Sequence, residues 1–274
     1  MQLGKDLAAV VTGGASGLGA ATARGLAAKG VRVAVFDVNA EVGERTAKEI
    51  GGLFVKCDVT SEASADAALA TARKAHGQER ILVNCAGIAA AKRITRRVKE
   101  TNAIEPHDLA TFTKVIQVNL IGTFMMISKS VAGMQAAAPL NDDNERGVVI
   151  CTSSVAAQDG QIGQVAYAAS KGGVYSMTLP IARDLSRDGI RVMTILPGLF
   201  LTPMFDTLSD DAKKSLAASV PFPSRLGDPK EYAALAVHIC ENPMLSTGSA
   251  SASTALCAWR RNRRTLPPSS HAAD

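Results

Sequence analysis

The sequence predicts a single α/β domain, with a doubly wound parallel sheet flanked by helices on both faces. The 274 residues suit one large domain, and 47% hydrophobic with 20% charged residues is a globular composition. Short apolar runs alternate with longer helix-like segments, which is the pattern of successive β-α-β units. A glycine-rich turn joins the first apolar run to the first helix-like segment. No linker rich in proline and serine divides the chain.

The predicted strands are short runs rich in valine, isoleucine and alanine. Strands of a parallel sheet are buried on both faces, so they are apolar throughout rather than alternating. They are expected at residues 7–12, 31–37, 54–57, 81–84, 148–152 and 191–196. The helices between them are expected at 20–29, 41–50, 61–76, 111–135 and 166–186, with Ser61 as an N-cap.

Two segments do not fit this alternation. Residues 91–108 are polar and basic, which predicts a surface insertion before the long helix. Residues 202–226 are rich in proline and serine, which predicts a mobile loop with a short helix. The domain is expected to cover 1–245, and 246–274 form an atypical tail.

The net charge of +5 gives little support for a nucleic-acid partner. Four arginines, at positions 260, 261, 263 and 264, lie in the tail, and the rest of the chain is nearly neutral. The sequence contains no run of about 18 apolar residues, so no membrane span is predicted. The N-terminus lacks the basic and apolar regions of a signal peptide, so a cytoplasmic location is expected.

The five cysteines occur singly, with no CxxC pair and no histidine at metal-ligand spacing. We expect them to be reduced, mostly buried thiols, and we expect no metal site. They are Cys57, Cys85, Cys151, Cys240 and Cys257.

The glycine-rich turn has the spacing of a dinucleotide-binding loop. Gly13, Gly17 and Gly19 allow a sharp turn and a close approach of a pyrophosphate to the N-terminus of the following helix. The same glycines also suit an ordinary strand–helix turn. Asp37 favours the dinucleotide-binding interpretation, because a carboxylate at the end of the second strand accepts hydrogen bonds from ribose hydroxyls and repels a 2′-phosphate. Asp37 therefore predicts NAD as the cofactor. The alternative is that Asp37 is only a turn residue at the end of the strand.

Two further strand ends carry polar or small residues. Asp58 and Val59 follow the third strand, where they suit contact with an adenine. Residues 84–87, Asn-Cys-Ala-Gly, end the fourth strand and bring small side chains beside a cofactor.

Tyr167 and Lys171 are four residues apart in a predicted helix, so they share one face. An ammonium near a phenol favours the phenolate, so we expect Lys171 to lower the pKa of Tyr167 into a range useful for proton exchange. The other two tyrosines, Tyr175 and Tyr232, lack a lysine four residues on and are interpreted as packing residues.

Ser154 follows the fifth strand and is placed to bind the substrate oxygen, although Ser153 is a close competitor. Asn119 lies inside an apolar helix, where an amide is costly unless it is paired. It is interpreted as a water- or backbone-bridging residue, with a satisfied core asparagine as the alternative.

Together these motifs resemble the short-chain dehydrogenases/reductases, which have a Rossmann-type sheet. TGGASGLG, Asp37, DV at 58–59, NCAG, YAASK and PG at 197–198 occur in that family's order. Residues 5–245 resemble more narrowly the type-2 3-hydroxyacyl-CoA dehydrogenases, also called 17β-hydroxysteroid dehydrogenases type 10. This implies a homotetramer that transfers hydride between NAD(H) and short-chain 3-hydroxyacyl-CoA or 3-ketoacyl-CoA.

The resemblance assigns the catalytic roles to Asn119, Ser154, Tyr167 and Lys171, and substrate contacts to Ser154 and Gln161. With the motifs above, it predicts a cofactor site formed by Gly13, Ser16, Gly17, Leu18, Gly19, Asp37, Asp58, Val59, Asn84, Cys85, Ala86, Gly87, Tyr167, Lys171, Pro197, Phe200 and Thr202. The basic residues of 91–108 are either a solvated loop or a site for the phosphates of CoA.

Two other functions remain open at this point. One is another alcohol or hydroxysteroid dehydrogenase of the same fold. The other is a non-catalytic subunit in RNA processing, a role implied by a mammalian relative. The catalytic set and the nearly neutral charge of residues 1–245 argue against this second function.

After Leu245 the sequence departs from the family, which ends with a last strand reading roughly GxxIRLDGAxRM. A shift of reading frame in a GC-rich gene would account for the departure, since suitable codons for 251–260 read two bases later give Arg-Leu-Asp-Gly-Ala-Leu-Arg-Met-Ala. We therefore expect the last strand to be altered, at a cost to stability.

Overall fold

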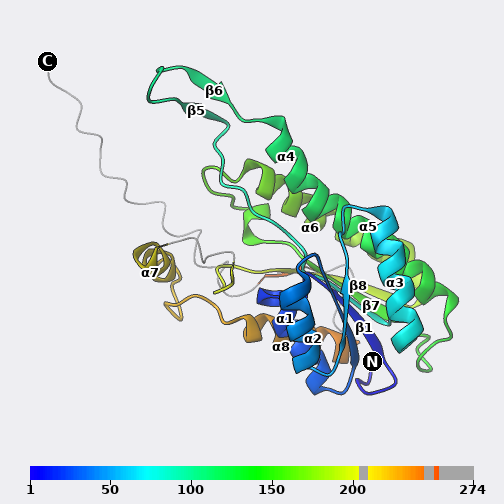
Figure 1. The fold of residues 1–274 in the computed structure, drawn as a ribbon. Helices are drawn as coiled ribbons and strands as arrows, with labels where there is room; N and C mark the ends of the chain where they lie inside the picture. The colour runs from blue at the N-terminus through cyan, green and yellow to red at the C-terminus, as the bar shows by residue number, and fades with distance from the viewer. Residues whose placement is uncertain (204–208, 244–249, 253–274) are drawn as a thin grey trace, which may run out of the picture.

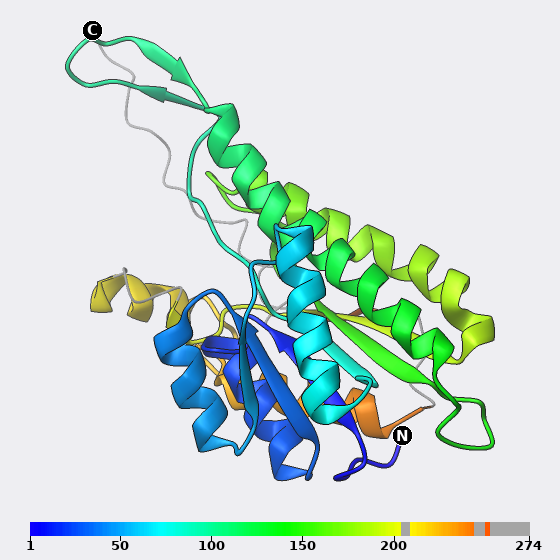
Figure 2. The same ribbon diagram turned by 45° about the vertical axis from the view of Figure 1, so that its right-hand side comes forward.

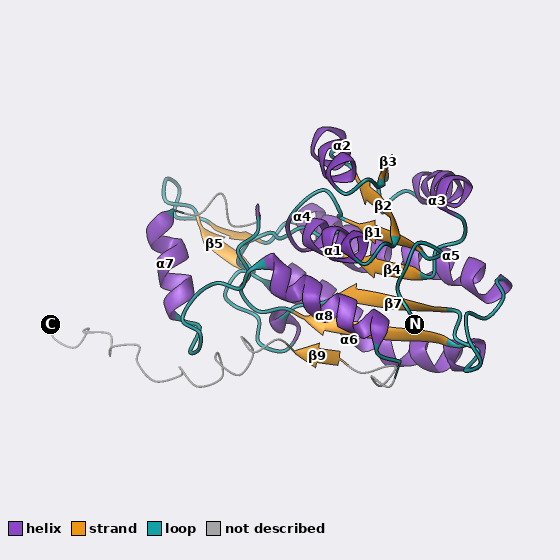
Figure 3. Ribbon diagram, turned by 90° about the horizontal axis from the view of Figure 1, so that it is seen from below, coloured by secondary structure: helices purple, strands orange, loops and turns teal. Residues whose placement is uncertain are grey.

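The computed structural model describes residues 1–203, 209–243 and 250–252, and it has the predicted α/β fold. Its main sheet is parallel, with the strand order β3-β2-β1-β4-β7-β8-β9. Figure 3 shows these strands side by side, from β3 at the top to β9 at the bottom. The strands are β1 (Ala8–Thr12), β2 (Arg32–Asp37), β3 (Leu53–Lys56), β4 (Ile81–Asn84), β7 (Gly147–Thr152), β8 (Ile190–Leu196) and β9 (Ala250–Ala252).

Helices cover both faces of this sheet (Figure 1). One face packs against α1 (Gly17–Ala28), α2 (Ala40–Glu49) and α8 (Pro229–Glu241). The other face packs against α3 (Glu62–His76), α5 (Gly122–Ala136) and α6 (Val165–Leu185). The predicted N-cap is confirmed: the Ser61 side chain accepts a hydrogen bond from the Ser64 backbone N–H at the start of α3.

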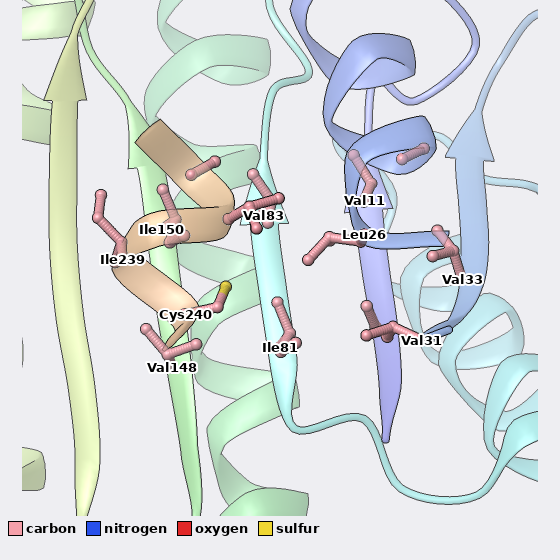
Figure 4. Packing of buried hydrophobic residues seen from close by; sticks show 14 of the residues in the cluster. Val11, Leu26, Val31, Val33, Ile81, Val83, Val148, Ile150, Ile239 and Cys240 are labelled. Atoms are coloured by element: carbon pink, nitrogen blue, oxygen red, sulfur yellow. The ribbon is translucent and has the colours of Figure 1, made fainter. Parts of the chain in front are cut away.

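Alternation along the strands divides the core into two layers. On β2, Val33 and Val35 face α1 and α8, whereas Ala34 and Phe36 face the opposite layer. Figure 4 shows the first layer, where Ile239 and Cys240 of α8 lie over side chains of the neighbouring strands. Because all strands of the sheet are parallel, their carboxyl ends meet at one edge, and this edge carries the functional residues.

The single long helix predicted at 111–135 is interrupted in the structure. It consists of α4 (Leu109–Ile116), one π-helical turn (Gln117–Ile121) and α5. The hydrophobic pattern missed the π turn because both flanking helices are apolar. Within the part of the chain that the structure describes, 109–136 is one helical segment long and apolar enough to cross a membrane by length and composition. Its apolar residues Met126, Ile127 and Met134 lie in the second core layer.

The predicted surface insertion forms an exposed antiparallel hairpin of β5 (Thr95–Arg97) and β6 (Ile104–Pro106). The hairpin extends away from the body of the molecule, beyond the start of α4 (Figure 2). The loop after β8 contains the expected short helix, α7 (Asp210–Ala218).

The C-terminal part of the chain differs from the predicted domain boundary. β9 lies beyond residue 245, yet it pairs in parallel with β8, with Ala250 opposite Thr194 and Ala252 opposite Leu196. It is an edge strand rather than a central one, and its sequence is Ala-Ser-Ala. The remainder of the predicted tail, 246–249 and 253–274, lies outside the described residues.

Candidate active site

A cleft of about 1810 Å³ lies at the carboxyl ends of the parallel strands. Its walls come from the glycine-rich turn, the ends of β2, β4 and β7, helix α4, the start of α6 and the loop after β8. A cavity at this position is where ligands bind in open α/β sheets, because the loops there diverge.

The glycine-rich turn is shaped so that side chains would obstruct it. Gly13 has φ +63°, and a Cβ atom on it would lie 2.6 Å from the Ala86 backbone nitrogen. A Cβ atom on Gly19 would lie 2.2 Å from the Gly13 carbonyl oxygen. Both positions therefore require glycine. Residues at the start of α1 line the cleft, and the N-terminus of a helix favours an anion. A pyrophosphate fits this surface.

Asp37 ends β2 and lines the cleft. One carboxylate oxygen accepts a hydrogen bond from the Ala15 N–H at 3.1 Å, and the other accepts one from the Asn39 N–H at 3.0 Å. The carboxylate is thus fixed beside the glycine-rich turn, with lone pairs left for further donors. A fixed anion at this position suits ribose hydroxyls and disfavours a phosphate.

Asp58 and Val59 form the wall beyond β3. The Thr60 backbone N–H and hydroxyl both donate to one Asp58 oxygen, at 2.9 and 2.7 Å, and these bonds lower the pKa of Asp58. Val59 is buried and supplies an apolar surface. The pair combines a fixed carboxylate with a flat apolar contact, which suits a heteroaromatic base.

Lys171 is a buried cation on α6, facing the end of β7. Its ammonium donates to the Thr152 carbonyl oxygen at 2.7 Å. Burial lowers the pKa of Lys171 to about 8. An ammonium with so low a pKa exchanges its proton close to neutral pH, which suits a site that moves protons.

The predicted effect of Lys171 on Tyr167 is not what the structure shows. Burial raises the pKa of Tyr167, and a hydrogen bond with Ser154 opposes this rise. The Lys171 nitrogen lies 5.8 Å from the centre of the tyrosine ring and is hydrogen-bonded to the backbone instead. The expectation of a lowered pKa was wrong, because sequence spacing does not reveal burial.

The two candidate serines, Ser153 and Ser154, have different contacts in the structure. The Ser153 hydroxyl is buried and donates to the Lys171 carbonyl oxygen at 2.7 Å, which fixes helix α6 to the end of β7. The Ser154 hydroxyl accepts a hydrogen bond from the Ala156 N–H at 3.1 Å and contacts Tyr167. Ser154 is therefore the serine placed beside the phenol.

Asn119 lies in the π turn and is completely buried. Its side-chain oxygen accepts from the Ile88 N–H at 2.8 Å, and its nitrogen donates to the Ile88 carbonyl at 2.9 Å and to the Ser170 hydroxyl at 3.0 Å. The amide thus bridges the chain after β4 to α6. This is the predicted backbone-bridging arrangement, and Asn119 itself is not part of the cleft wall.

Most of the predicted site residues line the cleft together. They are Gly13, Ser16, Gly17, Leu18, Gly19, Asp37, Asp58, Val59, Cys85, Ala86, Gly87, Ser154, Gln161, Tyr167, Lys171, Pro197, Phe200 and Thr202. Asn84 does not reach the cleft. Side chains alternate along β4, so Asn84 lies on the same side as Leu82 and is 2% exposed.

Sequence reasoning missed a group of cleft residues on helix α4 and at the start of the π turn. Ala110, Thr113, Lys114 and Gln117 recur at helical spacing and form one wall. That spacing was visible in the sequence, but nothing in it showed which helix face meets the cleft. Gln164, at the start of α6, was also missed.

The fold and this cleft define a nucleotide-dependent oxidoreductase of the α/β class, and comparison with known proteins specifies which family it is. Residues 7–213 match the family model described as short chain dehydrogenase. The chain belongs to that family.

Individual relatives agree with this assignment. The chain is 52% identical over 244 residues to the 3-hydroxyacyl-CoA dehydrogenase type-2 of Bos taurus, and 50% identical to that of Homo sapiens; each match covers 88% of this chain and 92% of the relative. The crystal structure of 3-hydroxyacyl-CoA dehydrogenase type-2 from Mycobacterium avium superposes with a TM-score of 0.83 at 40% identity, covering 90% of this chain and 94% of that one.

Proposed function

We propose that this chain is an NAD(H)-dependent dehydrogenase that interconverts short-chain 3-hydroxyacyl-CoA and 3-ketoacyl-CoA. The observation that carries the proposal is that Ser154, Tyr167 and Lys171 line one cleft with a glycine-rich loop in which Gly13 and Gly19 leave no room for a Cβ atom. The names of relatives with half of their residues identical support the substrate class.

The glycine-rich turn and Asp37 would hold a dinucleotide, and the side chains of Tyr167 and Lys171 would border its reactive end. When bound, NAD accepts or supplies the hydride. Asp37 supports NAD over NADP, because its carboxylate is fixed by Ala15 and Asn39 and would meet a 2′-phosphate as an unscreened like charge.

The protein's own part is to hold the substrate oxygen and to move its proton. In the reduction direction, the Tyr167 phenol, whose pKa is raised by burial, gives its proton to the substrate oxygen, and the Ser154 hydroxyl fixes that oxygen. Oxidation is the reverse step and starts from the Tyr167 phenolate. The buried Lys171 ammonium, held by the Thr152 carbonyl oxygen, would bond the ribose of the dinucleotide. Asn119 supports this by holding the chain after β4 against α6.

The hairpin before α4 is proposed to meet the phosphates of CoA, although part of its charge is already paired. Lys92 forms an ion pair with Asp108, and Arg96 forms one with Glu105. This leaves Arg93, Arg97 and Lys99 as the cations of greatest interest, since Arg97 bonds only the neutral Asn102. A CoA thioester and its N-acetylcysteamine analogue should then differ in kcat/KM, and equal values would remove the hairpin from substrate binding.

We further propose a homotetramer. Ile121, Phe124 and Leu179 are large apolar side chains of which more than two fifths is exposed, and they lie on the outer surfaces of the π turn, α5 and α6. Burial of such side chains against a second copy is favourable. Light scattering coupled to size-exclusion chromatography tests this, and a monomeric mass contradicts it.

The decisive experiment is NADH formation on 3-hydroxybutyryl-CoA by the wild-type protein and by Tyr167→Phe. We expect the variant to lose activity by orders of magnitude while it still binds NADH, as measured by fluorescence. A panel of other alcohols and hydroxysteroids identifies a different substrate if the CoA ester is not oxidised. Near-normal turnover by Tyr167→Phe would refute the assignment of the proton-transfer residue.

A further inference from the structure

Tyr232 lies on α8, on the opposite face of the sheet from the catalytic helix α6. Its side chain is 2% exposed. The sequence offered no role for it beyond packing, because no lysine follows four residues later. The Tyr232 hydroxyl nevertheless has a polar neighbour, because it lies beside the side chain of Thr152 at the carboxyl end of β7.

The Tyr232 hydroxyl belongs to a chain of three polar groups. Its oxygen lies 2.6 Å from the Thr152 hydroxyl oxygen and 3.8 Å from the Cys85 sulfur. The Thr152 hydroxyl donates to the Cys85 sulfur at 3.4 Å. A threonine hydroxyl has one proton, so when it donates to the sulfur, Tyr232 is the donor in the short bond. Burial raises the pKa of Tyr232, which keeps this phenol protonated.

Thr152 connects this chain to Lys171 through the sheet. Its side chain lies on the α8 side, where it meets Tyr232, and its carbonyl oxygen accepts the Lys171 ammonium at 2.7 Å. The next residue, Ser153, donates to the Lys171 carbonyl oxygen. The end of β7 therefore holds both ends of Lys171, and Tyr232 holds the end of β7 from behind.

The ring of Tyr232 has a separate contact. It meets the Phe200 ring edge-on, with centroids 6.5 Å apart and planes at 86°. Phe200 lines the cleft in the loop after β8. The hydroxyl and the ring thus touch two different parts of the site, and removal of the hydroxyl alone leaves the ring contact in place.

We propose that Tyr232 is a positioning residue, whose hydroxyl fixes Thr152 and thereby sets the position of the Lys171 ammonium in the cleft. This rests on the proposed function only in that the cleft is taken to be the site of hydride and proton transfer. Tyr232 touches neither substrate nor cofactor in this account and acts through the strand end alone.

The test is Tyr232→Phe, with Tyr175→Phe as a matched control on an exposed part of α6. We expect Tyr232→Phe to lower kcat about three- to tenfold, the rate equivalent of one neutral hydrogen bond. KM for the dinucleotide and the affinity for NADH should change less than kcat, because Lys171 bonds only the ribose of the dinucleotide and the Phe200 contact is kept. Tyr175→Phe should leave all three values unchanged. A kcat within twofold of wild type for Tyr232→Phe would overturn the proposal.

A double-mutant cycle separates positioning from general loss of structure. Thr152→Val removes the hydroxyl through which Tyr232 acts, so the double variant should be no slower than Thr152→Val alone. Fully additive losses would show that Tyr232 acts by another route, and so would a fall in NADH affinity equal to the fall in kcat.

Failure of the proposed substrate is distinguishable from failure of this proposal. If the wild type does not oxidise 3-hydroxyacyl-CoA, the same ratios are measured with whichever secondary alcohol it does oxidise. A crystal structure of Tyr232→Phe adds a readout without turnover. We expect the Thr152 side chain to rotate and the Lys171 ammonium to shift from the Thr152 carbonyl, and an unchanged strand end would contradict the proposal.

Discussion

Lys171 should destabilise the folded protein at neutral pH, so its replacement by methionine should raise stability while it abolishes activity. The side chain is buried, and burial lowers its pKa from 10.5 to about 8. Methionine has a similar length and no charge to desolvate. Active sites commonly hold such unfavourable groups, and their removal stabilises the fold at the expense of function.

The pKa of Lys171 sets the size and the pH range of this effect. A fall from 10.5 to about 8 corresponds to about 3 kcal/mol of unfolding free energy. Below pH 8 both folded and unfolded chains carry the proton, so the penalty is complete. Between pH 8 and 10.5 the folded chain releases the proton first, so the stability of the wild type rises with pH. The variant leaves the Thr152 carbonyl without its donor, at a cost of about 1–2 kcal/mol.

We therefore expect Lys171→Met to raise the free energy of unfolding by about 1–2 kcal/mol at pH 7, which corresponds to about 3–6 °C in Tm. Thermal unfolding followed by circular dichroism at pH 7, 8.5 and 10 measures it, and the gain should disappear towards pH 10. Lys129→Met is the control, since Asp66 and Glu62 raise the pKa of Lys129 and its loss should not stabilise the fold. A variant less stable than wild type at pH 7, or a gain that does not change with pH, would refute the reasoning.

Three further substitutions test other parts of the site. Asp37→Asn should raise the ratio of NADP to NAD use in kcat/KM at least tenfold, and an unchanged ratio would contradict the role of the carboxylate. Gly13→Ala should weaken NADH binding in a fluorescence titration, because the added Cβ meets the Ala86 nitrogen, whereas wild-type affinity would show that the turn does not hold the dinucleotide. Asn119→Ala should lower the free energy of urea unfolding by about 2–3 kcal/mol, since the Ile88 N–H loses its acceptor, and a loss below about 0.5 kcal/mol would contradict this.

The parts of the fold predictable from sequence were those encoded locally. The strand ends with Asp37 and Asp58, the glycines of the first turn and the helix of Tyr167 and Lys171 are each specified within a few residues. Parallel topology then brings their ends to one edge of the sheet. The site followed from these elements without knowledge of how any helix packs.

The parts that failed or stayed open depend on tertiary contacts. The pKa of Tyr167 is set by burial, and the choice between Ser153 and Ser154 by the backbone carbonyl of Lys171. Asn84 was wrongly predicted to line the cofactor site. Its position in the alternation of side chains along β4, and not its residue type, decides which face of the sheet its side chain lies on. Tyr232 is 80 residues from Thr152 in sequence, so no local pattern indicated their contact.

The π turn between α4 and α5 lets one helical segment serve two surfaces that are out of phase. An ordinary α-helix advances by about 100° per residue, so one extra residue rotates everything before it by that angle relative to everything after it. Deletion of a single residue within Gln117–Ile121 would therefore turn Thr113 and Lys114 out of the cleft wall while Met126 and Ile127 kept their places in the core. The number of residues in this segment therefore decides which side chains of α4 reach the cleft.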